Sequence, residues 1–155
     1  MAIATLAAGC FWGVEKQFRQ VKGVISTRVG YSNGTTKDPD YKQVCTGATG
    51  HAEVIEITFD GTIVSFESLL GVFWQLHDPT TANRQGVDIG TQYRSAVFYH
   101  NDEQKQQAEL VKKTLDSAHV FAQPIVTEIT AAETFYPAEE YHQCYLEKKG
   151  LGSCH

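Results

Sequence analysis

The chain has 155 residues, of which 42% are hydrophobic and 20% charged, an ordinary balance for a globular protein. Its 13 Lys and Arg against 18 Asp and Glu give a net charge of −5, and no basic run occurs, which argues against nucleic acid or an anionic membrane as a partner. No apolar run is long enough to span a bilayer, and the apolar segment before Cys10 is too short for a secretion signal. We therefore expect one domain over residues 1–155, a monomer in the cytoplasm.

The first stretch of interest joins a strand to a helix at a cysteine. Residues 3–8 are small and apolar and predict a short buried strand, and the helical spacing of apolar residues from Phe11 to Val21 predicts a helix. Cys10 lies between the two, where unpaired N–H groups and the helix dipole favour a thiolate. We interpret Cys10 as a nucleophile beside the aromatic side chains of Phe11 and Trp12. A buried cysteine that only fills space is the alternative that the pattern leaves open.

A second candidate lies on a strand. Residues 24–31 and 52–59 are rich in β-forming residues, and residues 41–45 predict one helical turn between them. Glu53 shares one face of its strand with the alternate apolar residues that follow it. Because an ionised carboxylate is costly to bury, we expect the pKa of Glu53 to be raised and the group to be partly protonated near neutrality. A strand-end Glu that turns out to solvent is the alternative.

The rest of the chain predicts further helices and strands. They are, in order, a helix over 66–76 capped by Ser65, a functional loop over 80–92, a strand over 95–100, a helix capped by Asn101 or Asp102 and continuing to Ala118, a strand over 124–130, a short helix over 139–146 and a mobile tail over about 147–155. This order predicts an α+β fold: a mixed β-sheet with packed helices, a split βαβ (ferredoxin-like) core and an irregular C-terminal tail.

The remaining cysteines and two tyrosines are further candidates. The cysteine and histidine spacings fit no zinc motif, so we expect no metal, and structural disulfides are the weaker interpretation in a chain with a full core. Cys154 stands next to last in a glycine-containing tail, where a resolving cysteine has reach and freedom. Cys45 we assign to packing. Tyr41 and Tyr93 could direct hydroxyls at a polar ligand atom, although most of the seven tyrosines are expected to pack between core and surface.

Five ordered motifs carry a family resemblance. They are Gly9-Cys10-Phe11-Trp12-Gly13, then Tyr41, then Thr49-Gly50-His51-Ala52-Glu53, then His77-Asp78-Pro79-Thr80, and then Gln85-Gly86-Val87-Asp88-Ile89-Gly90-Thr91-Gln92-Tyr93-Arg94-Ser95. Together they resemble the peptide methionine sulfoxide reductases of type A, over nearly the whole chain. The resemblance implies an enzyme that reduces the S epimer of methionine sulfoxide, free or in oxidised proteins, to methionine.

The resemblance also implies how the substrate is held and attacked. Cys10 would attack the sulfoxide sulfur. Phe11 and Trp12 would hold the methyl group of the substrate, and Asp88 would help to bind its backbone. A sulfoxide sulfur is only a modest electrophile, so a thiolate needs a nearby acid to make the oxygen a better leaving group.

Proton transfer and resolution complete the implied scheme. Glu53 would protonate the sulfoxide oxygen, assisted by the hydroxyls of Tyr41 and Tyr93. The sulfenic acid left on Cys10 would condense with Cys154 to a disulfide. Thioredoxin would then reduce this disulfide, with electrons from thioredoxin reductase and NADPH and with no cofactor bound to the chain.

Some alternatives remain. Cys144 departs from the family pattern, so it is either a spectator or an alternative resolving or relay thiol. A thiol peroxidase would share the cysteine chemistry, but it needs a cation beside the peroxide, and the sequence near Cys10 supplies none. A module that binds methionine-bearing peptides without catalysis is a third possibility, in which Cys10→Ser would leave binding intact.

Overall fold

The computed structural model describes residues 2–145, so the expected tail over about 147–155, with Cys154, lies outside the described residues. The elements, in order, are β1 (Ala2–Ala8), α1 (Phe11–Arg19), β2 (Val24–Ser32), α2 (Tyr41–Cys45), β3 (Ala52–Phe59), α3 (Phe66–Leu76), β4 (Arg84–Gln85), β5 (Asp88–Ile89), the 3₁₀ helix η1 (Thr91–Tyr93), β6 (Ser95–Tyr99), α4 (Asp102–Ser117), β7 (Glu128–Ala131), β8 (Tyr136–Pro137) and the 3₁₀ helix η2 (Glu140–His142).

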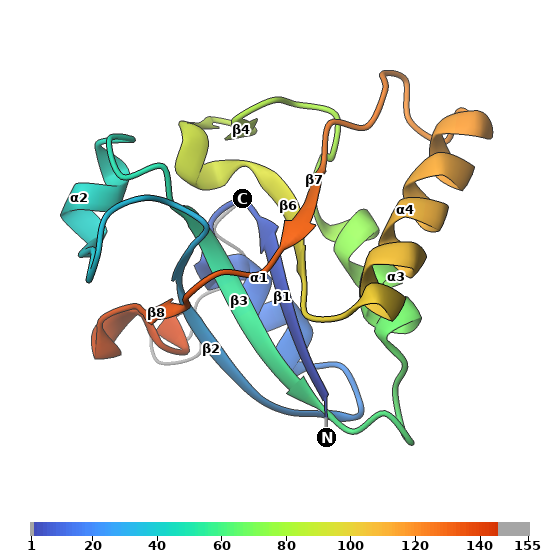
Figure 1. Cartoon of the computed structure of the whole chain (residues 1–155), viewed down its shortest axis with the longest axis horizontal. Coiled ribbons are helices and arrows are strands. Elements are labelled where there is room, and N and C mark those ends of the chain that lie inside the picture. Colours follow the sequence, from blue (N-terminus) through green and yellow to red (C-terminus); the bar gives the residue numbers. More distant parts are fainter. Residues whose placement is uncertain (1, 146–155) are drawn as a thin grey trace.

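One mixed sheet organises these elements, with the strand order β7-β6-β1-β3-β2-β8 (Figure 1). β3 lies between β1 and β2 and runs antiparallel to both, so β1 and β2 run parallel to one another with α1 as their connection. That arrangement is a split βαβ unit. β6 pairs antiparallel with the other edge of β1, which completes the ferredoxin-like order β6-β1-β3-β2. The predicted α+β fold with a mixed sheet is confirmed.

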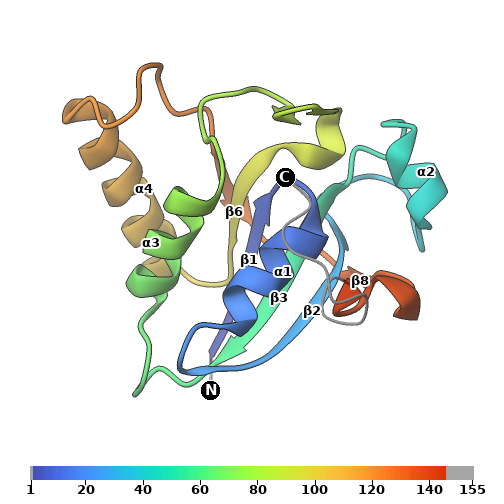
Figure 2. The same ribbon diagram turned by 180° about the vertical axis from the view of Figure 1, so that it is seen from behind.

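The two faces of the sheet are covered in different ways. α1 lies across one face, with α3 beside it (Figure 2). The core on this side joins apolar side chains of both helices to those of β3, among them Phe18, Phe73, Ile55 and Ile57. The segment that joins β7 to β8 crosses the opposite face, where it contributes Phe135 to a smaller apolar cluster (Figure 1). Glu53, two residues before Ile55 on β3, therefore faces the α1 side.

The predicted helix caps are present. The side chain of Ser65 accepts a hydrogen bond from the backbone N–H of Ser68 at 3.0 Å, and that of Asn101 accepts one from the N–H of Gln104 at 2.9 Å. These bonds satisfy N–H groups that the first turn of a helix leaves unpaired. Among residues 2–145, no helix is long and apolar enough to cross a membrane.

The prediction of an irregular loop over residues 80–92 is wrong in part. β4 and β5 form a small antiparallel hairpin within it, and η1 follows directly. The hairpin is fixed to the end of α3 by Gln85, whose side chain accepts from the N–H of Asp78 at 2.9 Å and donates to its carbonyl at 2.6 Å. Strands of two residues are too short to show an alternating pattern in the sequence.

Two predicted elements near the end of the described chain also differ. The strand expected over 124–130 starts later, because β7 pairs with β6 only over Glu128–Ala131. Of the short helix expected over 139–146, the described residues show the 3₁₀ turn Glu140–His142, a turn at Gln143 and Cys144, and a helical Tyr145. Cys144 has a φ of 53°, a left-handed conformation that cannot continue a right-handed helix.

Candidate active site

Cys10 lies where β1 ends and α1 begins. β1 is hydrogen-bonded to β6 as far as the pair Ala8 and Ser95, and Gly9 then turns the chain with a φ of 93°, which glycine tolerates. Cys10 is the residue before the first residue of α1, and its carbonyl accepts from the N–H of Val14 at 3.4 Å. Its side chain is partly exposed. The thiol is therefore held at a helix N-terminus, as the sequence predicts, and it has access to solvent.

Glu53 reaches the same helix end from β3. It is only 2% exposed, and its Oε1 accepts a hydrogen bond from the backbone N–H of Phe11 at 3.3 Å. The carboxyl group is therefore buried against the residue that follows Cys10. This confirms that Glu53 lies on the buried face of its strand and excludes the alternative in which it turns out to solvent.

Two tyrosine hydroxyls lie within electrostatic reach of Glu53. The pKa of Tyr41 is raised, first by burial, then by a hydrogen bond with the thiol of Cys45 and by the charge of Glu53. The pKa of Tyr93 is also raised, first by burial and then by the charge of Glu53, with further contributions that include Cys10. Both phenols therefore stay protonated at neutral pH and are available as hydrogen-bond donors.

Asp88 approaches the same group of side chains from the β4–β5 hairpin. It is partly buried, and its charge is among the smaller causes that raise the pKa of Tyr93. The hairpin and η1, both in the loop that the sequence predicts to be functional, thus bring Asp88 and Tyr93 toward Glu53. Glu53, at the N-terminus of α1, is thus within electrostatic reach of both tyrosines, and Asp88 is within reach of Tyr93.

Phe11 and Trp12 belong to a continuous group of aromatic rings. Phe11 is 1% exposed and packs on Tyr31 and Tyr41, with centroid distances of 5.8 and 6.5 Å. Trp12 is partly exposed and stacks on Tyr41 at 6.4 Å. An apolar, flat-sided surface next to a nucleophile and a buried acid suits a small alkyl group.

The other side of Trp12 is covered by the end of the described chain. Tyr145 stacks on the Trp12 ring with a centroid distance of 4.0 Å and an interplanar angle of 15°. His142 is 1% exposed, and its Nδ1 accepts a hydrogen bond from the indole N–H of Trp12 at 2.9 Å. We call Trp12, Tyr41, His142 and Tyr145 the aromatic wall. The sequence analysis did not identify His142 or Tyr145 as site residues.

Glu139 connects this last segment to the tyrosines of the site. Its Oε1 accepts from the hydroxyl of Tyr31 at 3.0 Å and its Oε2 from the backbone N–H of Tyr41 at 3.2 Å. Burial acts to raise the pKa of Glu139, but hydrogen bonds, including these two, outweigh it and lower the pKa overall. No local pattern marks Glu139, because both of its partners lie about a hundred positions earlier in the chain.

The cysteines are distributed unevenly around the site. Cys10 and Cys144 are partly exposed, whereas Cys45 is exposed. Cys45 is exposed, so its assignment to packing is wrong; its thiol lies beside the hydroxyl of Tyr41. Cys144 is partly exposed and directly precedes Tyr145. Within residues 2–145, no group of three or more His, Cys, Asp or Glu side chains could hold a metal ion.

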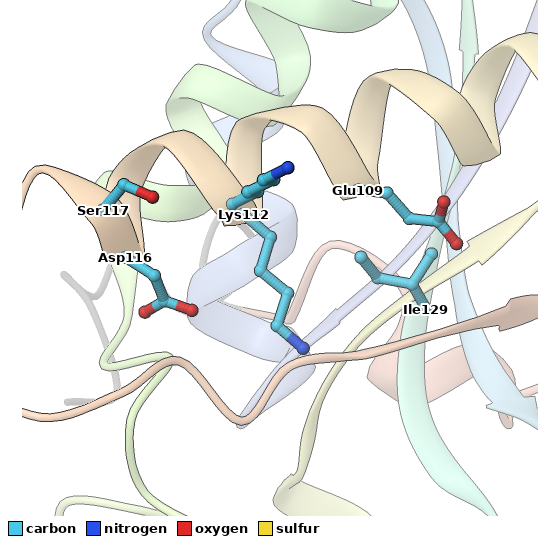
Figure 3. Close-up of a pocket in the computed structure, with 6 residues that line it drawn as sticks. Glu109, Lys112, Asp116, Ser117 and Ile129 are labelled. Atoms are coloured by element: carbon cyan, nitrogen blue, oxygen red, sulfur yellow. The ribbon is translucent and has the colours of Figure 1, made fainter.

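A separate pocket lies on another part of the molecule, between α4 and β7 (Figure 3). It is lined by Glu109, Lys112, Lys113, Asp116, Ser117 and Ile129. It contains none of the predicted site residues, and the amine of Lys112 donates to the carbonyl of Thr127 at 3.1 Å, which holds α4 to the chain before β7. We therefore assign the chemistry to the end of α1 and not to this pocket.

Comparison with known proteins identifies the family. The family model described as peptide methionine sulfoxide reductase matches residues 2–155. A protein of Methanosarcina acetivorans named peptide methionine sulfoxide reductase MsrA is 60% identical over 148 residues, which cover 96% of this chain and 79% of that protein. The chain belongs to the peptide methionine sulfoxide reductase family. It is thus a type A reductase, an oxidoreductase that acts on methionine sulfoxide.

Solved structures of the same family share the fold. Methionine sulfoxide reductase A of Corynebacterium diphtheriae superposes with a TM-score of 0.92 at 39% identity, covering 98% of this chain and 76% of that one. Mxr1 from Saccharomyces cerevisiae in complex with Trx2 superposes with a TM-score of 0.65 at 25% identity, covering 93% of this chain and 84% of that one. The fold and family expected from the motifs are confirmed.

The bond between Trp12 and His142 predicts a pH dependence of stability. His142 can accept at Nδ1 only when that atom carries no proton, and burial lowers the pKa of His142, partly offset by the charge of Glu139. Below about pH 6.5 the unfolded chain takes up a proton that the folded chain does not bind, so the free energy of unfolding falls as the pH drops below that value and is level above it.

We expect urea unfolding of the wild type to show this loss with a slope of at most about 1.4 kcal/mol per pH unit from His142. In His142→Gln the slope should be smaller. A second histidine, His100, also has a lowered pKa and remains in both proteins, so only the difference between the two curves is diagnostic. Superimposable slopes would show that His142 is protonated equally in both states.

Proposed function

We propose that this chain reduces methionine-S-sulfoxide, free or in proteins, with Cys10 as the nucleophile and Glu53 as the acid. The observation that carries the proposal is the hydrogen bond between the buried carboxyl of Glu53 and the backbone N–H of Phe11, next to Cys10. It brings a nucleophile and an acid to the same helix end. Tyr41 and Tyr93, both neutral donors within the field of Glu53, supply further hydrogen bonds there.

The chemical step transfers the sulfoxide oxygen from the substrate to Cys10. The thiolate of Cys10 forms a bond to the sulfoxide sulfur while the carboxyl of Glu53 gives its proton to the sulfoxide oxygen. The protonated oxygen then moves to the Cys10 sulfur, and both the sulfur–oxygen bond of the substrate and the new sulfur–sulfur bond break. Methionine leaves, reduced by two electrons, and Cys10 is oxidised to the sulfenic acid. Hydrogen bonds from Tyr41 and Tyr93 to the oxygen stabilise the charge that develops on it.

Substrate recognition follows from the shape and polarity of the site. Trp12, which is partly exposed, and its buried neighbour Phe11 form the apolar side of the site, to which we assign the methyl group, whereas the longer arm of methionine carries the polar backbone. Asp88 binds the backbone amine or amide of that arm. With the methyl group, the oxygen and the long arm each assigned to a different side of the site, only one configuration at sulfur presents its oxygen to Glu53.

Recycling requires a second thiol and an external reductant. Cys154 attacks the sulfenic acid of Cys10, water leaves and a disulfide forms, which thioredoxin then reduces with electrons from thioredoxin reductase and NADPH. The complex of the yeast relative Mxr1 with Trx2 supports thioredoxin as the partner. Thioredoxin keeps thiols reduced in the cytoplasm, where we place the reaction. Cys144, close to the aromatic wall, is the alternative resolving or relay thiol.

The role of Glu53 predicts a specific kinetic defect. Glu53→Gln keeps the size of the side chain and an oxygen that can accept from Phe11, but it has no acidic proton to give. Single-turnover formation of methionine should slow by about 10²–10⁴-fold, the usual contribution of positioned proton transfer, while the melting temperature changes little. An unchanged single-turnover rate would remove Glu53 from the mechanism.

If Cys154 resolves the sulfenic acid, removing its thiol should allow a single turnover but prevent repeated turnover. Cys154→Ser should form one methionine per enzyme and then stop, because the sulfenic acid has no partner with which to form the disulfide. Cys45→Ser, which removes an exposed thiol, is the matched control and should cycle normally with thioredoxin. If Cys154→Ser cycles normally and Cys144→Ser does not, Cys144 is the resolving thiol.

A further inference from the structure

Glu15 is a buried acid that the reaction scheme does not use. It lies on α1, one turn after Phe11, and is only 1% exposed. Its Oε2 accepts from the hydroxyl of Thr27 at 2.8 Å, and its Oε1 accepts from the backbone N–H of Cys144 at 2.5 Å. Both carboxyl oxygens thus accept a hydrogen bond, as a buried polar group requires, and one of the bonds reaches a residue 129 positions away.

The residue that Glu15 holds has an unfavourable backbone conformation. Cys144 has a φ of 53°, in the left-handed region that side chains other than Asn, Asp and Gly seldom adopt. Such a conformation persists when the surroundings fix it. The hydrogen bond from its own N–H to the buried carboxyl of Glu15 is the contact that fixes it from the α1 side.

The turn at Cys144 brings the next side chain onto Trp12. Tyr145 follows directly and stacks on the indole at 4.0 Å. Upstream, the side chain of Gln143 bonds to Val29 on β2 through both its oxygen, at 2.9 Å, and its amide, at 2.8 Å. Gln143 therefore holds the chain before the turn, and the bond between Glu15 and Cys144 holds the turn itself.

We propose that Glu15 is a positioning residue that sets the alkyl selectivity of the site. By fixing the left-handed turn at Cys144, it keeps Tyr145 stacked on one face of Trp12, and the partly exposed remainder of the ring then has one position from which to contact a substrate methyl group. Glu15 does not touch the substrate. The inference rests on the proposed role of Trp12 in binding the methyl group. It adds Glu15, remote from the sulfur, to the residues on which the fit of that group depends.

The test measures the dependence of single-turnover methionine formation on substrate concentration, before any recycling step. Glu15→Leu removes the carboxylate and should raise the half-saturating concentration of methionine sulfoxide about tenfold, with the maximal rate changed less than about threefold. The preference for methionine sulfoxide over ethionine sulfoxide, its ethyl analogue, should fall by a similar factor. Glu15→Gln, which can still accept from Cys144, should be intermediate.

A second measurement follows Trp12 without activity. The chain has two tryptophans, so in a Trp74→Phe background the fluorescence reports on Trp12 alone. Removing the contact with Glu15 should increase the quenching of this fluorescence by acrylamide, because Tyr145 no longer stays on the indole. Glu56→Gln is the matched control: it removes an acid on β3 that binds Arg28 and makes no contact with the aromatic wall, and it should change neither measurement.

A rescue distinguishes positioning from general stabilisation. Asn adopts the left-handed region more readily than Cys, so Cys144→Asn added to Glu15→Gln should restore at least half of the lost methyl-over-ethyl selectivity. Unchanged selectivity and quenching in Glu15→Leu would overturn the proposal. So would a loss of selectivity in Glu15→Gln that Cys144→Asn does not restore. If the wild type failed to reduce methionine sulfoxide, the proposed function would fail, and the quenching experiment would still test the contact.

Discussion

The hydrogen bond from the N–H of Phe11 to the carboxyl of Glu53 is the interaction on which the site depends. It joins the centre of the sheet to the first turn of α1, and it does so at the residue next to the nucleophile. A helix N-terminus can hold one anion through its unpaired N–H groups. Here two acidic groups, a thiol and a carboxyl, meet at that end. Reduction of a sulfoxide requires that the thiol is ionised, so that it can attack, while the carboxyl still has a proton to give.

The aromatic wall beside this pair is completed by the other end of the described chain. Glu139 binds Tyr31 and Tyr41, His142 binds Trp12, and Gln143 and Cys144 are fastened to β2 and α1. The same short segment therefore completes the aromatic surface and ends directly before the residues that lead to Cys154. The residues that complete the binding surface thus directly precede, in the chain, the residues that lead to the recycling cysteine. A substitution that removes one of the contacts of Glu139, His142, Gln143 or Cys144 is expected to alter the binding surface first.

The sequence predicted those parts of the site that depend on local patterns. The strand-to-helix junction at Cys10 and the buried face occupied by Glu53 follow from periodicity within about ten residues. Trp12 and His142 are 130 positions apart, so no window of the sequence could show their bond. The β4–β5 hairpin has strands of two residues, which carry no alternation, and a cysteine gives no sign of the left-handed conformation found at Cys144. Family motifs supplied Asp88 and the tyrosines, and the structure adds the neighbours that hold them.

The central claim, that Cys10 and Glu53 act on one sulfoxide from two sides, can be tested directly. Crystals of Cys10→Ser soaked in methionine sulfoxide should show the substrate sulfur over residue 10, its methyl group against Phe11 and Trp12, and its oxygen within about 3 Å of a carboxyl oxygen of Glu53. A substrate whose oxygen points away from Glu53, toward solvent or another donor, would contradict the account.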